Sequence, residues 1–128
     1  MKLKILLPAE VFLDSDVTKV IAESPLGSFT LLPRHIDLTT ALAPGILTYE
    51  DASGARKYVA LNEGLLVKQG ENVMISSRMA VAGELGGLRE RVEEFLTDID
   101  EKERKARSAV ARLEADFIRR FVEFGKNG

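Results

Sequence analysis

Turn-forming residues cut one stretch of this chain into short pieces, and this punctuation limits the fold more than any other feature. The breaks are Pro25-Leu26-Gly27, Pro33-Arg34 and Pro44-Gly45. Between them lie two short apolar runs, Phe29–Leu32 and Ile36–Ala43. Short strands bounded by Pro and Gly are typical of an antiparallel β fold.

The same alternation of short apolar runs and turns extends over residues 1–83. The turn clusters include Asp14-Ser15-Asp16, Asp51-Ala52-Ser53-Gly54 and Gln69-Gly70-Glu71-Asn72. The opening run Lys2–Leu7 is interpreted as a strand and not as a signal peptide, because its apolar part is short and ends at Pro8. About nine or ten short strands at regular spacing predict a sandwich or a barrel.

The character of the sequence changes at Gly83, after which no proline occurs and charged residues become frequent. One helical face is predicted from Leu85, Leu88, Val92, Phe95 and Ile99. A break at Thr97-Asp98 and a cap at Asp100 predict a second helix. Its apolar face comprises Ala106, Val110, Leu113, Phe117, Phe121 and Phe124. The expected fold is therefore mainly β plus α: a β-sandwich domain over residues 1–83, then an antiparallel helical hairpin over residues 84–128.

Composition excludes several classes of function. The chain has no cysteine and one histidine, so neither a thiolate site nor a multi-histidine metal site is expected within it. The net charge of −2 gives no general electrostatic attraction to nucleic acid. No apolar run approaches the length of a membrane span, so direct membrane insertion is not expected. No phosphate-binding glycine loop is present either, and no cofactor is expected.

The single histidine, His35, is the one residue that suggests catalysis. Ser24 or Ser28 would be the nucleophile and Asp37 the orienting carboxylate of a small hydrolase. A serine site also needs a sharply placed nucleophile and an oxyanion hole, and the sequence indicates neither. Two further interpretations of His35 remain open: a structural histidine in a β corner, and an interface histidine that contacts a partner. A free-standing adaptor protein with an unrelated helical partner is a further alternative for the function of the chain.

The order of the motifs resembles the epsilon subunit of F-type ATP synthases over essentially the whole chain. The residues that carry the resemblance are Gly27, Leu32-Pro33-Arg34-His35, Leu42-Ala43-Pro44-Gly45 and Glu63-Gly64-Leu65-Leu66-Val67, followed by the helical region. Thr30 stands where the family usually has a second glycine, and the proline expected after the histidine is absent, with Asp37 in its place. The first and last segments look most like the alternate branch, the sodium-associated N-type ATPases.

The resemblance implies a ten-stranded β-sandwich in a non-catalytic rotor subunit of the central stalk. Its partners would be the gamma subunit, the c-ring and the catalytic beta subunits, at the cytoplasmic face of the bacterial inner membrane. By the same resemblance, Leu26, Gly27 and Ser28 would face the c-ring, and His35 would lie near gamma. Arg104, Lys105, Arg107 and Arg112 would meet acidic catalytic subunits and restrain ATP hydrolysis.

Some members of the family bind ATP through a motif at the start of the first helix. The corresponding residues here are Leu85-Gly86-Gly87-Leu88-Arg89-Glu90. Gly86 replaces the aspartate of the motif, and Glu90 adds negative charge where a triphosphate would lie. Weak or absent ATP binding is therefore expected.

Overall fold

The computed structural model describes the backbone of residues 1–127 and the side chains of residues 1–110, 112 and 113. The chain divides into two compact units, Met1–Phe95 and Leu96–Gly128. The division into domains at residue 83 that the sequence suggests stays a prediction. The first unit holds all nine strands found in the described residues.

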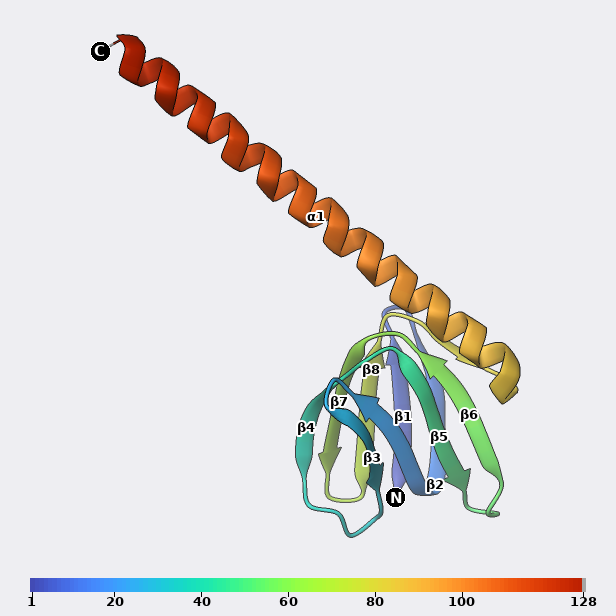
Figure 1. Ribbon diagram of the computed structural model, residues 1–128. Coiled ribbons are helices and arrows are strands. Elements are labelled where there is room, and N and C mark those ends of the chain that lie inside the picture. The colour runs from blue at the N-terminus through green and yellow to red at the C-terminus, as the bar shows by residue number, and fades with distance from the viewer. Residues whose placement is uncertain (128) are drawn as a thin grey trace. The chain divides into compact units, whose positions relative to one another are not determined.

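Nine strands form the β-sandwich of the first unit (Figure 1). They are β1 (Lys2–Leu7), β2 (Glu10–Ser24), β3 (Gly27–Leu31), β4 (Leu38–Leu42), β5 (Gly45–Asp51), β6 (Arg56–Leu61), β7 (Gly64–Gln69), β8 (Asn72–Ser77) and β9 (Ala80–Ala82). The hydrogen-bonded order is β4-β7-β8-β1-β2-β5-β6-β9, and β3 pairs with β2. All pairings are antiparallel except that of β1 with β8.

Strand β2 belongs to both sheets. Its first half, Glu10–Asp16, pairs with β1, and its second half pairs with β5 and β3. The register with β5 shifts between Val17 and Lys19, where the strand passes from one sheet to the other. Such irregularities bend a strand and increase its twist. One continuous backbone therefore joins the two layers.

The expectation of ten strands is wrong, because Asp14-Ser15-Asp16 does not form a turn. These residues continue β2 and lie opposite β1, with Lys2 paired to Asp16 and Lys4 to Asp14 in the backbone register. Lys2 Nζ also lies 3.5 Å from Asp14 Oδ1. Opposite charges on neighbouring strands stabilise the pairing. The acidic cluster, which suggests a turn in the sequence, is therefore part of strand β2.

The core of the sandwich comes from the alternating inward positions of its strands. Strand β8 shows this most clearly, because Val73 and Ile75 are buried while Asn72 and Met74 are exposed. The largest fully buried apolar side chains are Leu3, Ile5, Val20, Leu31, Leu47, Val59, Leu66, Val73 and Ile75. Period-two burial on both sheets confirms the predicted β-sandwich.

A smaller apolar cluster lies on the other side of β6. Ala60 of β6 packs with Leu88 and Phe95, which belong to the first turns of helix α1 (Leu85–Asn127). Ile46, Tyr58, Val81 and Val92 surround them. The predicted apolar face of the first helix is thus confirmed at Leu88 and Phe95, and these turns belong to the same compact unit as the sandwich.

The predicted hairpin is not confirmed, because residues 85–127 form one helix. Thr97 and Asp98 lie inside it, and no proline or glycine lies between Leu88 and Phe124 to end it. Lys102 Nζ lies 3.1 Å from Asp98 Oδ2, an i,i+4 ion pair that supports the helix across the expected break. The predicted apolar positions Phe117, Phe121 and Phe124 lie outside the described side chains.

Candidate functional site

The turn between β2 and β3 carries the residues expected to face the c-ring. Ser24 pairs with Gly27, so Pro25 and Leu26 form the tip. The Ser24 hydroxyl accepts from the amide of Leu26 at 3.2 Å and donates to the carbonyl of Gly27 at 3.0 Å. Gly27 has a φ of 126°, which favours glycine. The result is a tight turn that presents Leu26, 99% exposed, to the outside.

His35 lies in the loop between β3 and β4, at the opposite end of β3 from the Leu26 turn. Its amide donates to the carbonyl of Leu32 at 2.9 Å, and its ring Nδ1 lies 2.8 Å from the carbonyl of Ile36. Both Leu32 and Ile36 are exposed, the latter at 77%. The loop therefore presents an apolar surface on both sides of His35.

The residues considered for a hydrolase are not brought together. The hydroxyl of Ser24 is engaged with its own turn, and Asp37 accepts through Oδ1 from the amide of Gly70 at 2.8 Å. His35 bonds to the Ile36 carbonyl and not to Asp37. Ser28 lies in β3, beyond the Leu26 turn. A nucleophile, base and orienting group must form a hydrogen-bonded chain, so this arrangement does not support the hydrolase hypothesis.

Strand β7 contributes an exposed apolar surface that the sequence did not single out. Leu66 and Lys68 face the core, while Leu65 and Val67 are 51% and 38% exposed. Val67 lies opposite Met74 of β8, which is 45% exposed. We call Leu65, Val67 and Met74 the outer apolar patch. In the sequence, the sign of this surface was the run of apolar residues on both faces of β7. Because lysine is usually exposed, Lys68 would predict that its own face of the strand is exposed and that Leu65 and Val67 are buried, the opposite of what is observed.

The four basic residues expected to restrain hydrolysis all lie on α1, in the unit Leu96–Gly128. Arg104, Lys105, Arg107 and Arg112 are all exposed. Arg107 Nη2 lies 3.9 Å from Glu103 Oε2, at the distance limit of an ion pair. Val110 and Leu113, 54% and 69% exposed, are apolar neighbours along the same segment. This segment presents basic and apolar side chains that are open to a partner.

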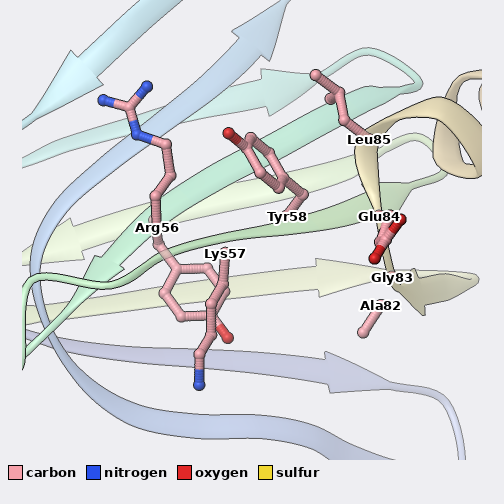
Figure 2. A pocket seen from close by; sticks show the side chains of 8 residues that line it. Arg56, Lys57, Tyr58, Ala82, Gly83, Glu84 and Leu85 are labelled. Atoms are coloured by element: carbon pink, nitrogen blue, oxygen red, sulfur yellow. The ribbon is translucent and has the colours of Figure 1, made fainter.

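A hollow of about 370 Å³ lies beside β6 and the start of α1 (Figure 2). Its lining is Tyr49, Arg56, Lys57, Tyr58, Ala82, Gly83, Glu84 and Leu85. Both cations are already paired, Arg56 with Glu50 at 3.3 Å and Lys57 with Asp51 at 3.5 Å. Figure 2 shows Arg56 and Tyr58 on the same side of β6. Ligand pockets of this size usually add convergent polar groups, and the paired charges here do not supply them.

The described part of the chain also bears on metal binding and on membrane crossing. No group of three or more His, Cys, Asp or Glu side chains gathers there in a way that would hold a metal ion. Helix α1, over its described residues, contains no stretch apolar enough to cross a membrane.

Comparison with known proteins agrees with the β-sandwich. The family model described as "ATP synthase, Delta/Epsilon chain, beta-sandwich domain" matches residues 1–83. The ATP synthase epsilon chain 2 of Paraburkholderia xenovorans is 30% identical over 127 residues, covering 97% of this chain and 91% of the relative. The ATP synthase epsilon chain of Sulfurovum sp. is 32% identical over 119 residues, covering 89% and 93%.

Solved structures share the fold at lower identity. A chain of the Euglena gracilis mitochondrial ATP synthase matches with a TM-score of 0.60 and 24% identity, over 72% of this chain and 61% of that one. A chain of the Tetrahymena thermophila mitochondrial ATP synthase matches with a TM-score of 0.54 and 14% identity, over 63% and 65%. This chain thus spans less than two thirds of either structure's chain. On the family model and the sequence relatives together, the chain belongs to the delta/epsilon family of ATP synthase subunits.

Proposed function

We propose that the chain is the epsilon-type subunit of the central stalk of a rotary ATP synthase, a non-catalytic part that couples rotation of the c-ring to the catalytic head. The observation that carries this proposal is the match to epsilon chains along 97% of the sequence, sandwich and helix together. A subunit with this role needs surfaces for partners and no reaction centre of its own.

The c-ring contact is proposed for Leu26 at the tip of the turn and for Gly27 and Ser28, which begin β3 beside it. A fully exposed leucine on a tight turn supports this role, because such a side chain gains from burial against a partner. Ser28 stands where family members often carry an acidic residue, so a hydrogen bond from its hydroxyl replaces a salt bridge in this proposal.

The gamma contact is proposed for the loop around His35 and for the outer apolar patch. Leu32 and Ile36 in the loop and Leu65, Val67 and Met74 in the patch are all exposed apolar residues. Interfaces bury such residues at their centre and leave polar groups at the rim. These two exposed regions support a partner on this unit.

Four finer points belong to the same proposal. The complex would lie at the cytoplasmic face of the bacterial inner membrane and would belong to the N-type branch. The helix would also have a folded-back state with its turn at Thr97-Asp98, the antiparallel hairpin that the sequence suggests. Restraint of ATP hydrolysis by Arg104, Lys105, Arg107 and Arg112 would depend on which state the helix adopts.

Cross-linking in the assembled complex tests the proposal, since the natural chain has no cysteine to interfere. Cysteine at Ser28 should cross-link to the c-ring. Cysteine at Ala52 is the matched control, because its turn follows Asp51, which pairs with Val17 at the other end of the sheet. Cross-links from Ser28→Cys to catalytic subunits alone, or equal c-ring cross-links from Ala52→Cys, would contradict the proposed orientation. Failure to co-purify with gamma would favour a free-standing adaptor.

A further inference from the structure

Lys68 is the largest fully buried side chain of the sandwich, with 2% of its surface exposed. Lysine is almost never buried to this extent without a partner. Its partners here are three backbone carbonyls: His35 at 2.6 Å, Gly70 at 2.7 Å and Pro33 at 3.4 Å. An ammonium group has three N–H donors, so each donor has one acceptor.

The acceptors come from two segments far apart in the sequence. Pro33 and His35 belong to the loop between β3 and β4, and Gly70 lies in the turn between β7 and β8. The amide of Gly70 also donates to Asp37 Oδ1, so a second bond joins the same loop to the same turn. The loop is thus anchored by a buried side chain that does not belong to the exposed surface of the loop.

The placement of Lys68 conflicts with the simplest pattern for its strand. A shift of one residue would expose Lys68 and bury Leu65 and Val67, which is the ordinary arrangement for an amphipathic strand. The observed register instead buries the lysine and leaves two large apolar residues outside. Departures from local pattern of this kind are expected where function requires them.

We propose that Lys68 is a positioning residue that fixes the backbone of residues 33–37 and so sets the geometry with which the His35 loop meets gamma. This inference rests on the proposed function, because it assigns gamma to that loop. Hydrogen bonds to an ammonium are stronger than those between neutral groups. Two of them end on the loop and the third ties Lys68 to the turn between β7 and β8. Together they hold the exposed Leu32 and Ile36 in a fixed arrangement, so the loop does not need to become ordered on binding.

Lys68→Met tests this, because methionine keeps a long unbranched chain and removes all three donors. Removing the ammonium also removes the cost of burying its charge. The carbonyls that it leaves belong to Pro33, His35 and Gly70, which are exposed and so open to water. We therefore expect the thermal midpoint to stay the same or rise, while amide hydrogen exchange in residues 32–37 accelerates about tenfold or more and exchange in β1 and β2 does not change. The affinity for purified gamma should fall about tenfold. Lys57→Met, which removes an exposed lysine from β6, should change neither the hydrogen exchange of residues 32–37 nor the affinity for gamma.

A double-mutant cycle separates positioning from general stability. If Lys68 acts through the loop, the losses of gamma affinity from Lys68→Met and His35→Ala will not add, whereas two independent structural effects will add. Unchanged loop exchange in Lys68→Met, or additive losses, would overturn the inference. If Lys68→Met does not fold, Lys68→Gln serves in its place, and failure of both to fold would overturn the inference by making Lys68 a residue of the whole fold.

Failure of the proposed function can be told apart from failure of the inference about Lys68. If the unaltered chain does not bind gamma, the proposed partner is wrong, and the part of the inference that concerns gamma is overturned with it. The exchange measurement on the isolated chain still decides whether Lys68 fixes the loop.

Discussion

Asp51 organises the turn between β5 and β6. Its Oδ1 accepts from the Ser53 hydroxyl at 2.6 Å and from the amides of Ser53 and Ala55, both at 3.0 Å. The Ser53 hydroxyl is the largest cause that holds the pKa of Asp51 below its ordinary value; both amides and the charge of Lys57 add to it, and burial opposes it. Gly54, with a φ of 86°, completes the turn.

This lowered pKa predicts a pH dependence of stability. A carboxyl whose pKa is lower in the folded state stabilises the fold fully above its unfolded pKa of about 3.9, and the contribution is lost as the pH falls through the folded pKa. Asp51→Asn should therefore be less stable than the parent above about pH 4, and the difference should shrink at lower pH. Urea unfolding at a series of pH values measures this. Asp16→Asn, which removes the same charge from β2, should not reproduce the pattern.

Gly64 is required for a different reason, namely the close approach of two strands. A Cβ at this position would collide with the carbonyl oxygen of Ser76 on β8. Gly64→Ala should cost about 1–3 kcal/mol in the free energy of unfolding, the usual range for overpacking. Gly87→Ala is the matched control in α1, where a Cβ meets nothing within 4 Å. It should be neutral or stabilise by up to about 1 kcal/mol, and a loss at Gly87 equal to that at Gly64 would contradict this explanation.

Among the elements, the first turns of α1 act as part of the sandwich. Leu88 and Phe95 are 2% and 6% exposed and cover Ala60. A fragment of residues 1–96 should therefore melt close to the full chain. A fragment of residues 1–83 should still unfold cooperatively, but its free energy of unfolding should be lower by about 3 kcal/mol or more, since burial of one Leu or Phe side chain contributes about 1.5–3 kcal/mol. Equal melting temperatures for the two fragments would show that the first turns of α1 do not stabilise the sandwich.

How far these elements follow from sequence depends on how local their causes are. Turns such as Asp51–Gly54 were predictable because Asp and Gly determine them by local hydrogen bonds and backbone conformation. The uninterrupted β2 was not, because Asp14-Ser15-Asp16 is held by cross-strand partners on β1. Lys68 was missed for the same reason: two of its three acceptors lie in a distant loop. The expected break at Thr97-Asp98 is not confirmed, because residues with low helix propensity end a helix less often than Pro or Gly does.

At the scale of the whole molecule, the basic residues of α1 lead to a prediction about the complex. Each exposed pair with an acidic partner contributes about 0–1 kcal/mol, but several together reach the roughly 1.4 kcal/mol that changes a population ratio tenfold. Replacing Arg104, Lys105, Arg107 and Arg112 by Ala should raise ATP hydrolysis by the complex. Because exposed charges are screened by salt, the increase should be largest at low ionic strength.

The matched control removes four acidic residues of the same helix, Asp98, Asp100, Glu101 and Glu103, by changing them to Ala. This variant should not raise hydrolysis. An unchanged rate in the basic variant and in a chain that ends at Gly83, with assembly intact, would contradict the inhibitory role.

The passage of β2 through both sheets has a mechanical consequence. In a sandwich whose layers touch only through side chains, a shearing force is resisted by packing alone. Here any sliding of one layer over the other must stretch a covalent backbone and break the ladders that β2 forms with β1 on one side and β5 on the other. A load applied at the Leu26 turn therefore enters the end of this same strand and is carried along it into both layers, which is the stiffness that a part transmitting torque requires.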